Sequence, residues 1–185
     1  GQKGYSVAPD AVFVTGLSAG GAQAVNVLAT HPDLFAAGAL VAALPFGASS
    51  LSMTLPETHT PEEWAAMVND ASGYSGAYPR IIAFHGCIAK SAVSLTGCVG
   101  GDGVVSHENL KEIIKQWTGL HGADLEAAAT RAVNGYPERR FQDATGIVGV
   151  DTYSLPGLGH ALPVDPNGSG GLGQGGTVDV FAADA

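Results

Sequence analysis

The chain has 185 residues, of which 45% are hydrophobic and 14% are charged. This composition predicts one packed globular domain over residues 1–185 and excludes a disordered chain. The net charge of −9 repels phosphate backbones, so we expect no nucleic-acid partner. No apolar run approaches the ~20 residues that a membrane-spanning helix needs, so we expect no membrane partner either.

The first predicted elements form a strand–turn–helix pattern. The β-rich run at residues 11–15 predicts a strand, and residues 19–29 predict a helix that ends before His31-Pro32. The sequence Gly-Leu-Ser-Ala-Gly lies at the junction, at residues 16–20. In this setting Gly-x-Ser-x-Gly is the form of a nucleophile elbow, which exposes a serine hydroxyl above the edge of a sheet.

Ser18 is the candidate nucleophile of this elbow. We expect Gly16 and Gly20 to be required because a Cβ atom at either position would clash in the tight turn. The backbone N–H of Ala19, at the helix N-terminus, is the candidate donor to an oxyanion formed beside Ser18. Because the motif can arise by chance in a chain with 27 glycines, the assignment depends on finding the partners of a catalytic serine.

The elements that follow alternate between strands and helices, which is typical of an α/β layered sheet. The apolar run at 35–44 predicts a strand covered on both faces, and an irregular loop follows at 45–60. Thr60 and Glu63 predict a capping box at the start of a helix that continues to about residue 71. Three bulky side chains here are candidate walls of a substrate pocket, with core packing as the commoner alternative: Phe46, Met53 and Trp64.

Four further segments complete the predicted layout. A strand at 80–84 is followed by a long loop at 85–103 and by a helix at 106–121. Residues 125–132 predict a short helix or an irregular segment. The last predicted strand covers residues 148–155.

A catalytic serine needs a histidine base and an acid that orients this base, in the chain order Ser, Asp or Glu, His. His160 follows the last predicted strand in a glycine-flanked loop, so it is the candidate base. Asp102 is the only carboxylate in the loop after the 80–84 strand, so it is the candidate acid. His85 also follows that strand, but it precedes the acid and breaks the order. Three other carboxylates remain alternatives for the acid: Asp124, Asp143 and Asp151.

The two cysteines, Cys87 and Cys98, lie eleven residues apart. This spacing allows a local disulfide, which would bring Asp102 back near the end of the 80–84 strand. Such a bond implies an oxidising compartment. Two cysteines are too few for a metal site built from Cys ligands alone, and we expect neither a metal nor another cofactor.

Three ordered blocks carry a family resemblance. VFVTGLSAGGAQAVNVLATHPDLFAAGALVAALPFG resembles the elbow region of polyhydroxybutyrate-depolymerase-like esterases. These esterases group with the feruloyl and acetylxylan esterases of carbohydrate esterase family 1. DGVVSHENLKEIIKQWTGLHGAD resembles the acid loop of the family, and YSLPGLGHALPVDP resembles its histidine loop. Asp102 therefore matches the acid of the family, and His160 matches the base.

The resemblance implies a fold of the α/β-hydrolase type, with a mostly parallel sheet and flanking helices. It also implies a secreted or periplasmic serine esterase without a cofactor, in which Ser18 attacks an ester carbonyl. His160 would act as general base and then as general acid, and Asp102 would orient His160. The implied partner is an ester substrate: a polyhydroxyalkanoate, a feruloyl or acetyl ester on plant polysaccharide, or a small ester.

The chain departs from the family pattern in two ways. In the family the acid follows the His-Gly of its strand almost directly, whereas residues 87–101 intervene here. Family members also carry several strands before the elbow, one of whose loops supplies the second oxyanion donor, and a closing helix after the histidine. We therefore expect the C-terminal part of the fold without those elements. The alternative to an active esterase is a catalytically incomplete piece that needs an upstream segment or a second chain.

Overall fold

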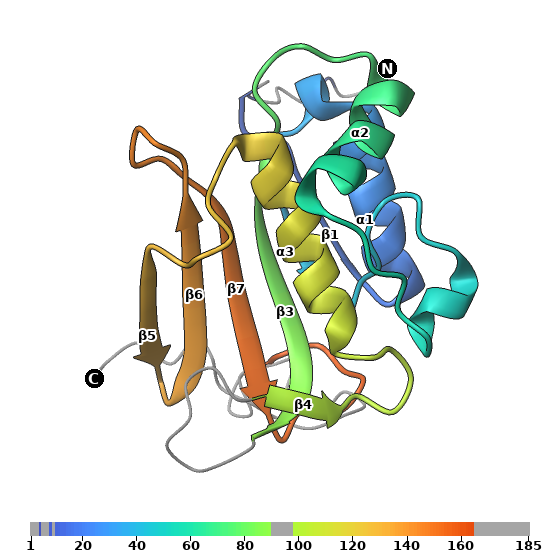
Figure 1. Ribbon diagram of the computed structural model, residues 1–185, viewed down its shortest axis with the longest axis vertical. Helices are drawn as coiled ribbons and strands as arrows, with labels where there is room; N and C mark the ends of the chain where they lie inside the picture. Colours follow the sequence, from blue (N-terminus) through green and yellow to red (C-terminus); the bar gives the residue numbers. More distant parts are fainter. Residues whose placement is uncertain (1–3, 5–7, 9, 90–97, 165–185) are drawn as a thin grey trace.

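A computed structural model describes residues 4, 8, 10–89 and 98–164. These residues form a seven-stranded sheet with the strand order β1-β2-β3-β7-β6-β5, and β4 pairs with β3 off this path (Figure 1). The strands are β1 (Phe13–Leu17), β2 (Ala37–Val41), β3 (Arg80–Ala89), β4 (Cys98–Gly101), β5 (Ala129–Val133), β6 (Tyr136–Gln142) and β7 (Val148–Pro156). The α-helices of this part of the chain are α1 (Ala19–Thr30), α2 (Pro61–Ser72) and α3 (Glu108–His121).

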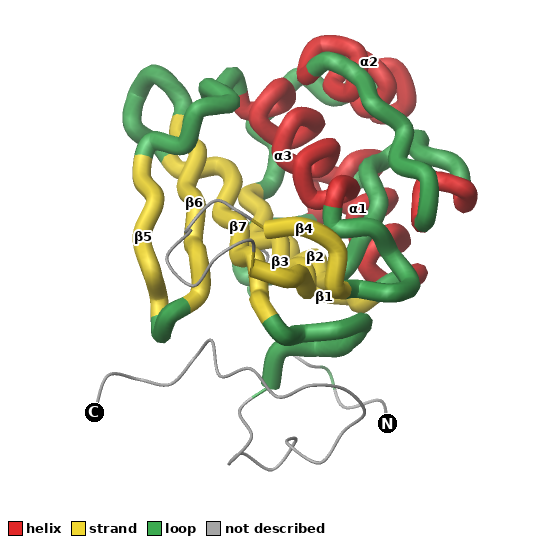
Figure 2. Tube along the Cα trace, turned by 60° about the horizontal axis from the view of Figure 1, so that its bottom comes forward, coloured by secondary structure: helices red, strands yellow, loops and turns green. Residues whose placement is uncertain are grey.

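The sheet has a parallel half and an antiparallel half. β1, β2, β3 and β7 run parallel, so their carboxyl ends meet at one edge, which lies at the bottom of Figure 1. β6 and β5 continue the sheet beyond β7 as an antiparallel hairpin. Figure 2 shows α1, α2 and α3 on the same side of the parallel strands. The fold is thus of the α/β-hydrolase type that the sequence predicts.

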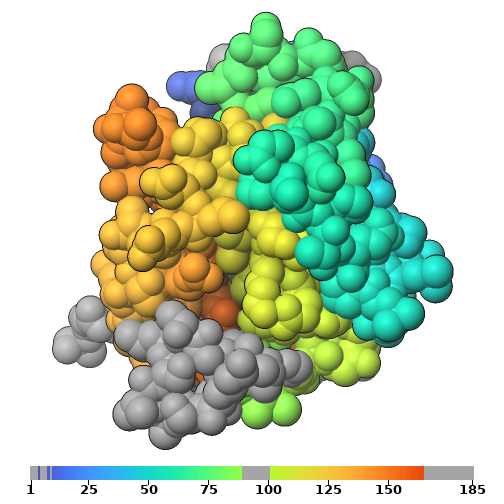
Figure 3. Space-filling view, viewed as in Figure 1, coloured from blue at the N-terminus to red at the C-terminus, as the bar shows by residue number. Residues whose placement is uncertain are grey.

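The main core lies between these helices and the sheet. Val25 and Leu28 of α1 and Trp117 of α3 are fully buried in it. Leu28 lies so close to β2 that a Cβ atom on Gly38 would come within 2.3 Å of its Cδ1 atom. In Figure 3 the side chains of α2, in teal, pack against those of α3, in yellow. The capping box at the start of α2 is confirmed, because Thr60 and Glu63 each accept a hydrogen bond from the other's backbone N–H.

Two predicted segments need correction. The predicted loop at 85–103 is wrong at both ends, because β3 continues to Ala89 and β4 pairs with it antiparallel. The prediction of a helix or irregular segment at 125–132 is right only for the irregular residues 125–128, because residues 129–132 belong to β5 of the hairpin β5–β6. Asn134 and Gly135 form the hairpin turn with φ of 49° and 82°. The Asn-Gly pair, a strong hairpin signal, could have indicated this turn.

Candidate active site

The Gly-x-Ser-x-Gly sequence forms a sharp turn between β1 and α1. Ser18 has φ 58° and ψ −122°, a backbone conformation that non-glycine residues rarely adopt. Its N–H donates to the Val41 carbonyl oxygen at 2.9 Å, and its own carbonyl accepts the Ala22 N–H at 2.9 Å. The turn is therefore held by β2 on one side and by the first turn of α1 on the other.

The glycines of the turn have unequal roles. A Cβ atom on Gly16 would lie 2.1 Å from the Gly20 carbonyl oxygen, so only glycine fits there. The expectation for Gly20 is wrong, because nothing lies within 4 Å of the position that its Cβ atom would occupy. The second crowded position is Gly21, where a Cβ atom would meet the Val41 carbonyl oxygen at 2.9 Å.

A pocket of 280 Å³ opens beside the elbow. Ser18 and Ala19 line it at the start of α1, together with Ala42 at the end of β2 and Met53 from the following loop. Ala19 is the first residue of α1, and the N–H groups of the first helical turn have no partner within their own helix, so its role as oxyanion donor stays a prediction. Ala42 also has a positive φ, of 45°. Two strained backbone positions thus line one pocket, a pattern found at functional sites.

The acid and the histidine are brought together, although they are 58 residues apart in the chain. His160 Nδ1 lies 2.8 Å from Asp102 Oδ2. The other carboxylate oxygen of Asp102 accepts the backbone N–H groups of Val104 at 2.8 Å and Val105 at 2.9 Å. The carboxylate is thereby fixed on one side by its own loop and on the other by the imidazole that it would orient.

The histidine loop reaches this position by lying across the end of β3. The Gly157 N–H donates to the Cys87 carbonyl oxygen at 3.0 Å. A Cβ atom on Gly86 would come within 2.1 Å of the Leu158 carbonyl oxygen, so the close approach requires glycine. Leu158 and Ala161 are buried with Val41 in a second hydrophobic cluster. Leu17, which precedes Ser18 in the elbow, packs against this cluster. These contacts carry the loop from β7 back toward β2.

The electrostatics of Asp102 favour its charged form. Burial alone would raise the pKa of this carboxyl group, but the hydrogen bonds from His160, Val105 and Val104 outweigh burial and lower the pKa. Asp102 is therefore ionised at neutral pH. An ionised carboxylate at this position stabilises an imidazolium on the neighbouring ring.

Two more histidines are buried behind the acid loop. The rings of His85 and His107 are nearly perpendicular, with centroids 5.3 Å apart. His85 contacts the Gly86 carbonyl oxygen at 3.0 Å, and His107 contacts the Ser154 hydroxyl at 3.3 Å. Burial lowers the pKa of both, that of His107 to about 4. Both are therefore neutral at pH 7.

Among the described residues, no hydrogen bond joins the Ser18 hydroxyl to the His160 ring. Such catalytic hydrogen bonds are often long before substrate binds.

The three alternative acids have other environments. Asp151 lies 3.2 Å from Arg140, Asp143 caps the turn before β7, and Asp124 lines a different cavity near the end of α3.

The candidate pocket walls separate into two groups. Met53 lines the pocket beside Ser18, but neither Phe46 nor Trp64 does. Trp64 is fully buried and donates its indole N–H to Glu112, so it is a core residue. Phe46 packs its side chain against the main core.

The disulfide predicted between Cys87 and Cys98 stays a prediction because the side chain of Cys98 lies outside the described residues. The backbone of Cys98 belongs to β4, next to β3.

The backbone amides that hold Asp102 were not among the sequence-based predictions. The Asp-Gly pair at 102–103 could have indicated them, because an Asp side chain before glycine commonly accepts N–H groups two or three residues later. In the described part of the chain, no group of three His, Cys, Asp or Glu side chains is placed to share a metal ion. None of the helices found there is long and apolar enough to cross a bilayer.

The site can be compared with those of known proteins. The poly(3-hydroxyalkanoate) depolymerase C of Paucimonas lemoignei is 34% identical over 188 residues, covering 97% of this chain and 42% of the depolymerase. The feruloyl esterase B of Talaromyces stipitatus is 33% identical over 176 residues, covering 87% of this chain and 44% of the esterase. This chain thus spans less than half the length of these curated relatives.

A solved structure shows the same architecture. The acetyl xylan esterase from Aspergillus awamori superposes with a TM-score of 0.67 at 27% sequence identity, covering 85% of this chain and 57% of that chain. No protein-family model matches the chain. By sequence and by fold, the chain is therefore similar to α/β-hydrolase-type esterases that include poly(3-hydroxyalkanoate) depolymerases, feruloyl esterases and acetylxylan esterases.

Proposed function

We propose that this chain carries the catalytic centre of a secreted serine esterase, with Ser18, His160 and Asp102 as its triad. The observation that carries the proposal is the combination of a strained serine elbow with the pair of buried Asp102 and partly buried His160 at the same edge of the sheet. Secretion is supported by the predicted disulfide, which needs an oxidising compartment. The esterase relatives support hydrolysis of carboxylic esters as the chemistry.

The proposed reaction follows from the roles of the three side chains. His160 takes the proton of the Ser18 hydroxyl as the oxygen attacks the ester carbonyl, and it then protonates the leaving alcohol. Asp102 keeps the Nδ1 side of His160 protonated and stabilises the imidazolium. Water then hydrolyses the acyl-enzyme by the same steps. The Ala19 N–H donates to the oxyanion, and a second donor would strengthen this stabilisation.

The substrate proposal stays at the level of ester class. The relatives are named for poly(3-hydroxyalkanoates), feruloyl esters and acetylxylan. We propose a polyester, a polysaccharide-linked ester or a small ester as the substrate. No cofactor takes part in this mechanism.

We also propose that a further segment or a second chain pairs with β1. β1 is the last strand on its side of the described sheet, and Phe13 on it is 66% exposed. Phe13 and Thr15 line an apolar hollow with Ala37 and Ile82. An exposed apolar edge strand favours pairing with another strand. Such a partner is also the proposed source of the second oxyanion donor, and without it the chain would be a catalytically incomplete hydrolase.

The replacement Ser18→Ala tests the proposed nucleophile. We expect kcat for p-nitrophenyl butyrate to fall by about 10⁶, to background, with the melting temperature preserved. Ser75→Ala is the matched control because Ser75 is exposed in the loop between α2 and β3, and it should retain full activity. Undiminished hydrolysis by purified Ser18→Ala protein would refute the assignment.

A further inference from the structure

One wall of the pocket beside Ser18 is an irregular segment of the chain. Leu44, Ala48, Ser50 and Met53 line the pocket from this segment, which follows β2. We call residues 44–57 the pocket wall. Apart from the short 3₁₀ turn Ser50–Met53, it contains no helix or strand. Besides a few turn hydrogen bonds within the segment, several of its backbone groups are bonded by side chains instead of by a neighbouring strand.

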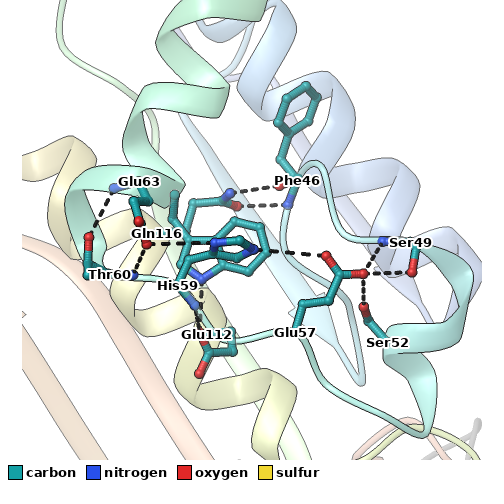
Figure 4. Close-up of polar contacts among 10 residues, drawn as sticks. Phe46, Ser49, Ser52, Glu57, His59, Thr60, Glu63, Glu112 and Gln116 are labelled. Carbon is teal, nitrogen blue, oxygen red and sulfur yellow. Dashed lines mark hydrogen bonds and ion pairs between the residues drawn. The ribbon is translucent and has the colours of Figure 1, made fainter.

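Gln116 of α3 supplies two of these hydrogen bonds. Its side-chain oxygen accepts the Phe46 N–H at 2.8 Å, and its side-chain nitrogen donates to the Phe46 carbonyl oxygen at 3.0 Å (Figure 4). Gln116 is fully buried. The amide thus pairs with Phe46 as a neighbouring strand would, and removing it leaves a donor and an acceptor unpaired.

Glu57 holds the middle of the pocket wall. One of its carboxylate oxygens accepts the Ser49 N–H at 3.1 Å, the Ser49 hydroxyl at 2.6 Å and the Ser52 hydroxyl at 2.8 Å (Figure 4). The hydrogen bonds from Ser49 and Ser52 lower the pKa of Glu57, so it is charged at neutral pH. His59 lies 4.0 Å from its other oxygen.

The pocket wall is also bonded to the segment that follows Asp102. The Ser106 N–H donates to the Met53 carbonyl oxygen at 2.6 Å. The side-chain amide of Asn109, which is buried, donates to the carbonyl oxygens of Ser52 at 2.7 Å and Ser106 at 3.1 Å. The pocket wall and the acid loop are therefore parts of one hydrogen-bonded unit anchored on α3.

We propose that Gln116 and Glu57 are positioning residues that fix the pocket wall and thereby set the size of the ester group that the site accepts. This inference rests on the proposed function of Ser18. Neither residue lines the pocket, so each acts through the backbone that it holds. A wall fixed at Phe46, Ser49 and Ser52 keeps the pocket small, whereas a released wall can move aside for a longer acyl chain.

The test compares the p-nitrophenyl esters of acetate, butyrate and octanoate. Gln116→Met removes both hydrogen bonds at nearly constant volume, and Glu57→Ala removes all three on Ser49 and Ser52. Thr118→Val is the control for Gln116, because Thr118 is also fully buried in α3 but bonds only within its helix. Glu62→Ala is the control for Glu57, because Glu62 is an exposed carboxylate in the first turn of α2. All proteins are assayed well below their melting temperatures.

We expect both test variants to raise kcat/KM for octanoate relative to acetate by about tenfold, mainly through a lower KM for octanoate. The controls should keep the ratio of the unmodified protein. An unchanged ratio in both test variants of an active protein would overturn this inference and leave the proposed function intact. An equal change in the controls would overturn it as well, because general loosening would then explain the effect. Slow hydrolysis is expected of the unmodified protein while it lacks the second oxyanion donor, but no detectable hydrolysis of any of the three esters would overturn the proposed function together with the inference.

Discussion

The serine elbow and the Asp102–His160 pair, which we propose as nucleophile and acid–base partners, are built in different ways. Ser18 obtains its strained conformation within one short stretch, between the end of β1 and the start of α1, with a single outside bond to Val41. Asp102 and His160 meet only because β3, β4 and β7 bring two distant loops to one sheet edge. The comparison shows that one end of the site depends on local backbone geometry and the other on tertiary packing.

The largest expected effect in this comparison comes from replacing Asp102, whose contact with His160 depends on tertiary packing. Asp102→Asn retains the shape of the acid but no longer accepts the Nδ1–H of His160 as a charged group, which favours the wrong tautomer. We expect kcat to fall by about 10⁴ with a smaller change in KM. Steady-state kinetics on a small ester measures this.

Asp124→Asn is the matched control, because Asp124 lies near the end of α3 and lines a different cavity. It should keep normal activity. If Asp102→Asn were as active as this control, Asp102 would not be the acid. The claim that part of the site depends on tertiary packing would then fail.

The dependence of Ser18 on local backbone geometry can be tested with two glycines of the elbow. Gly16→Ala places a Cβ atom 2.1 Å from the Gly20 carbonyl oxygen, so the turn must distort. We expect the free energy of unfolding to fall by roughly 3 kcal/mol and most activity to be lost. Gly20→Ala meets open space within α1 and should be neutral or stabilising by up to about 1 kcal/mol.

Urea denaturation measures the free energy of unfolding of the two variants, and ester hydrolysis measures their activity. The two glycines occupy equivalent places in the motif, so sequence alone assigns them equal roles. Equal losses in both variants would contradict the turn geometry described here.

The smallest expected effect concerns the buried histidines behind the acid loop. Burial lowers the pKa of His107 from 6.5 to about 4, so the unfolded chain binds this proton first as the pH falls. The stability that neutral His107 provides is complete above pH 6.5 and is lost as the pH falls toward 4. The loss should approach ~2–3 kcal/mol.

Denaturation curves between pH 7 and pH 4 measure this loss. His107→Phe should flatten the dependence on pH, whereas His31→Phe, at the exposed end of α1, should not. An unaltered slope in His107→Phe would show that this histidine does not titrate as described.

The same contrast explains how much of the molecule could be predicted from its sequence. The elbow, α1 and the capping box of α2 depend on neighbouring residues, so local patterns predict them. Chain order and family resemblance predicted Asp102 as the acid and His160 as the base, and the two side chains lie within hydrogen-bonding distance of each other. Two local signals were present but missed: Asn134-Gly135 for the β5–β6 hairpin and the Asp102-Gly103 pair for the amides that hold the acid.

Other features depend on contacts that no local pattern encodes. Gly86 is required because the histidine loop, more than seventy residues later in the chain, passes directly over it. Gln116 holds Phe46 through its backbone groups alone, which place no demand on the Phe46 side chain. Glu57 holds Ser49 and Ser52 mainly through their hydroxyl groups, but no local pattern marks this set of residues. Trp64 was a plausible pocket residue by type, and only the packing of α2 shows that it belongs to the core.

Covalent labelling of Ser18 tests the central claim most directly. The purified protein is treated with an alkyl fluorophosphonate, which reacts with activated serine hydroxyls, and the adduct is located by mass spectrometry of its peptides. One adduct per chain, on the peptide that contains Ser18, is expected, together with a much slower reaction in Asp102→Asn. An adduct on another serine, or equal labelling rates in both proteins, would contradict a triad of Ser18, His160 and Asp102.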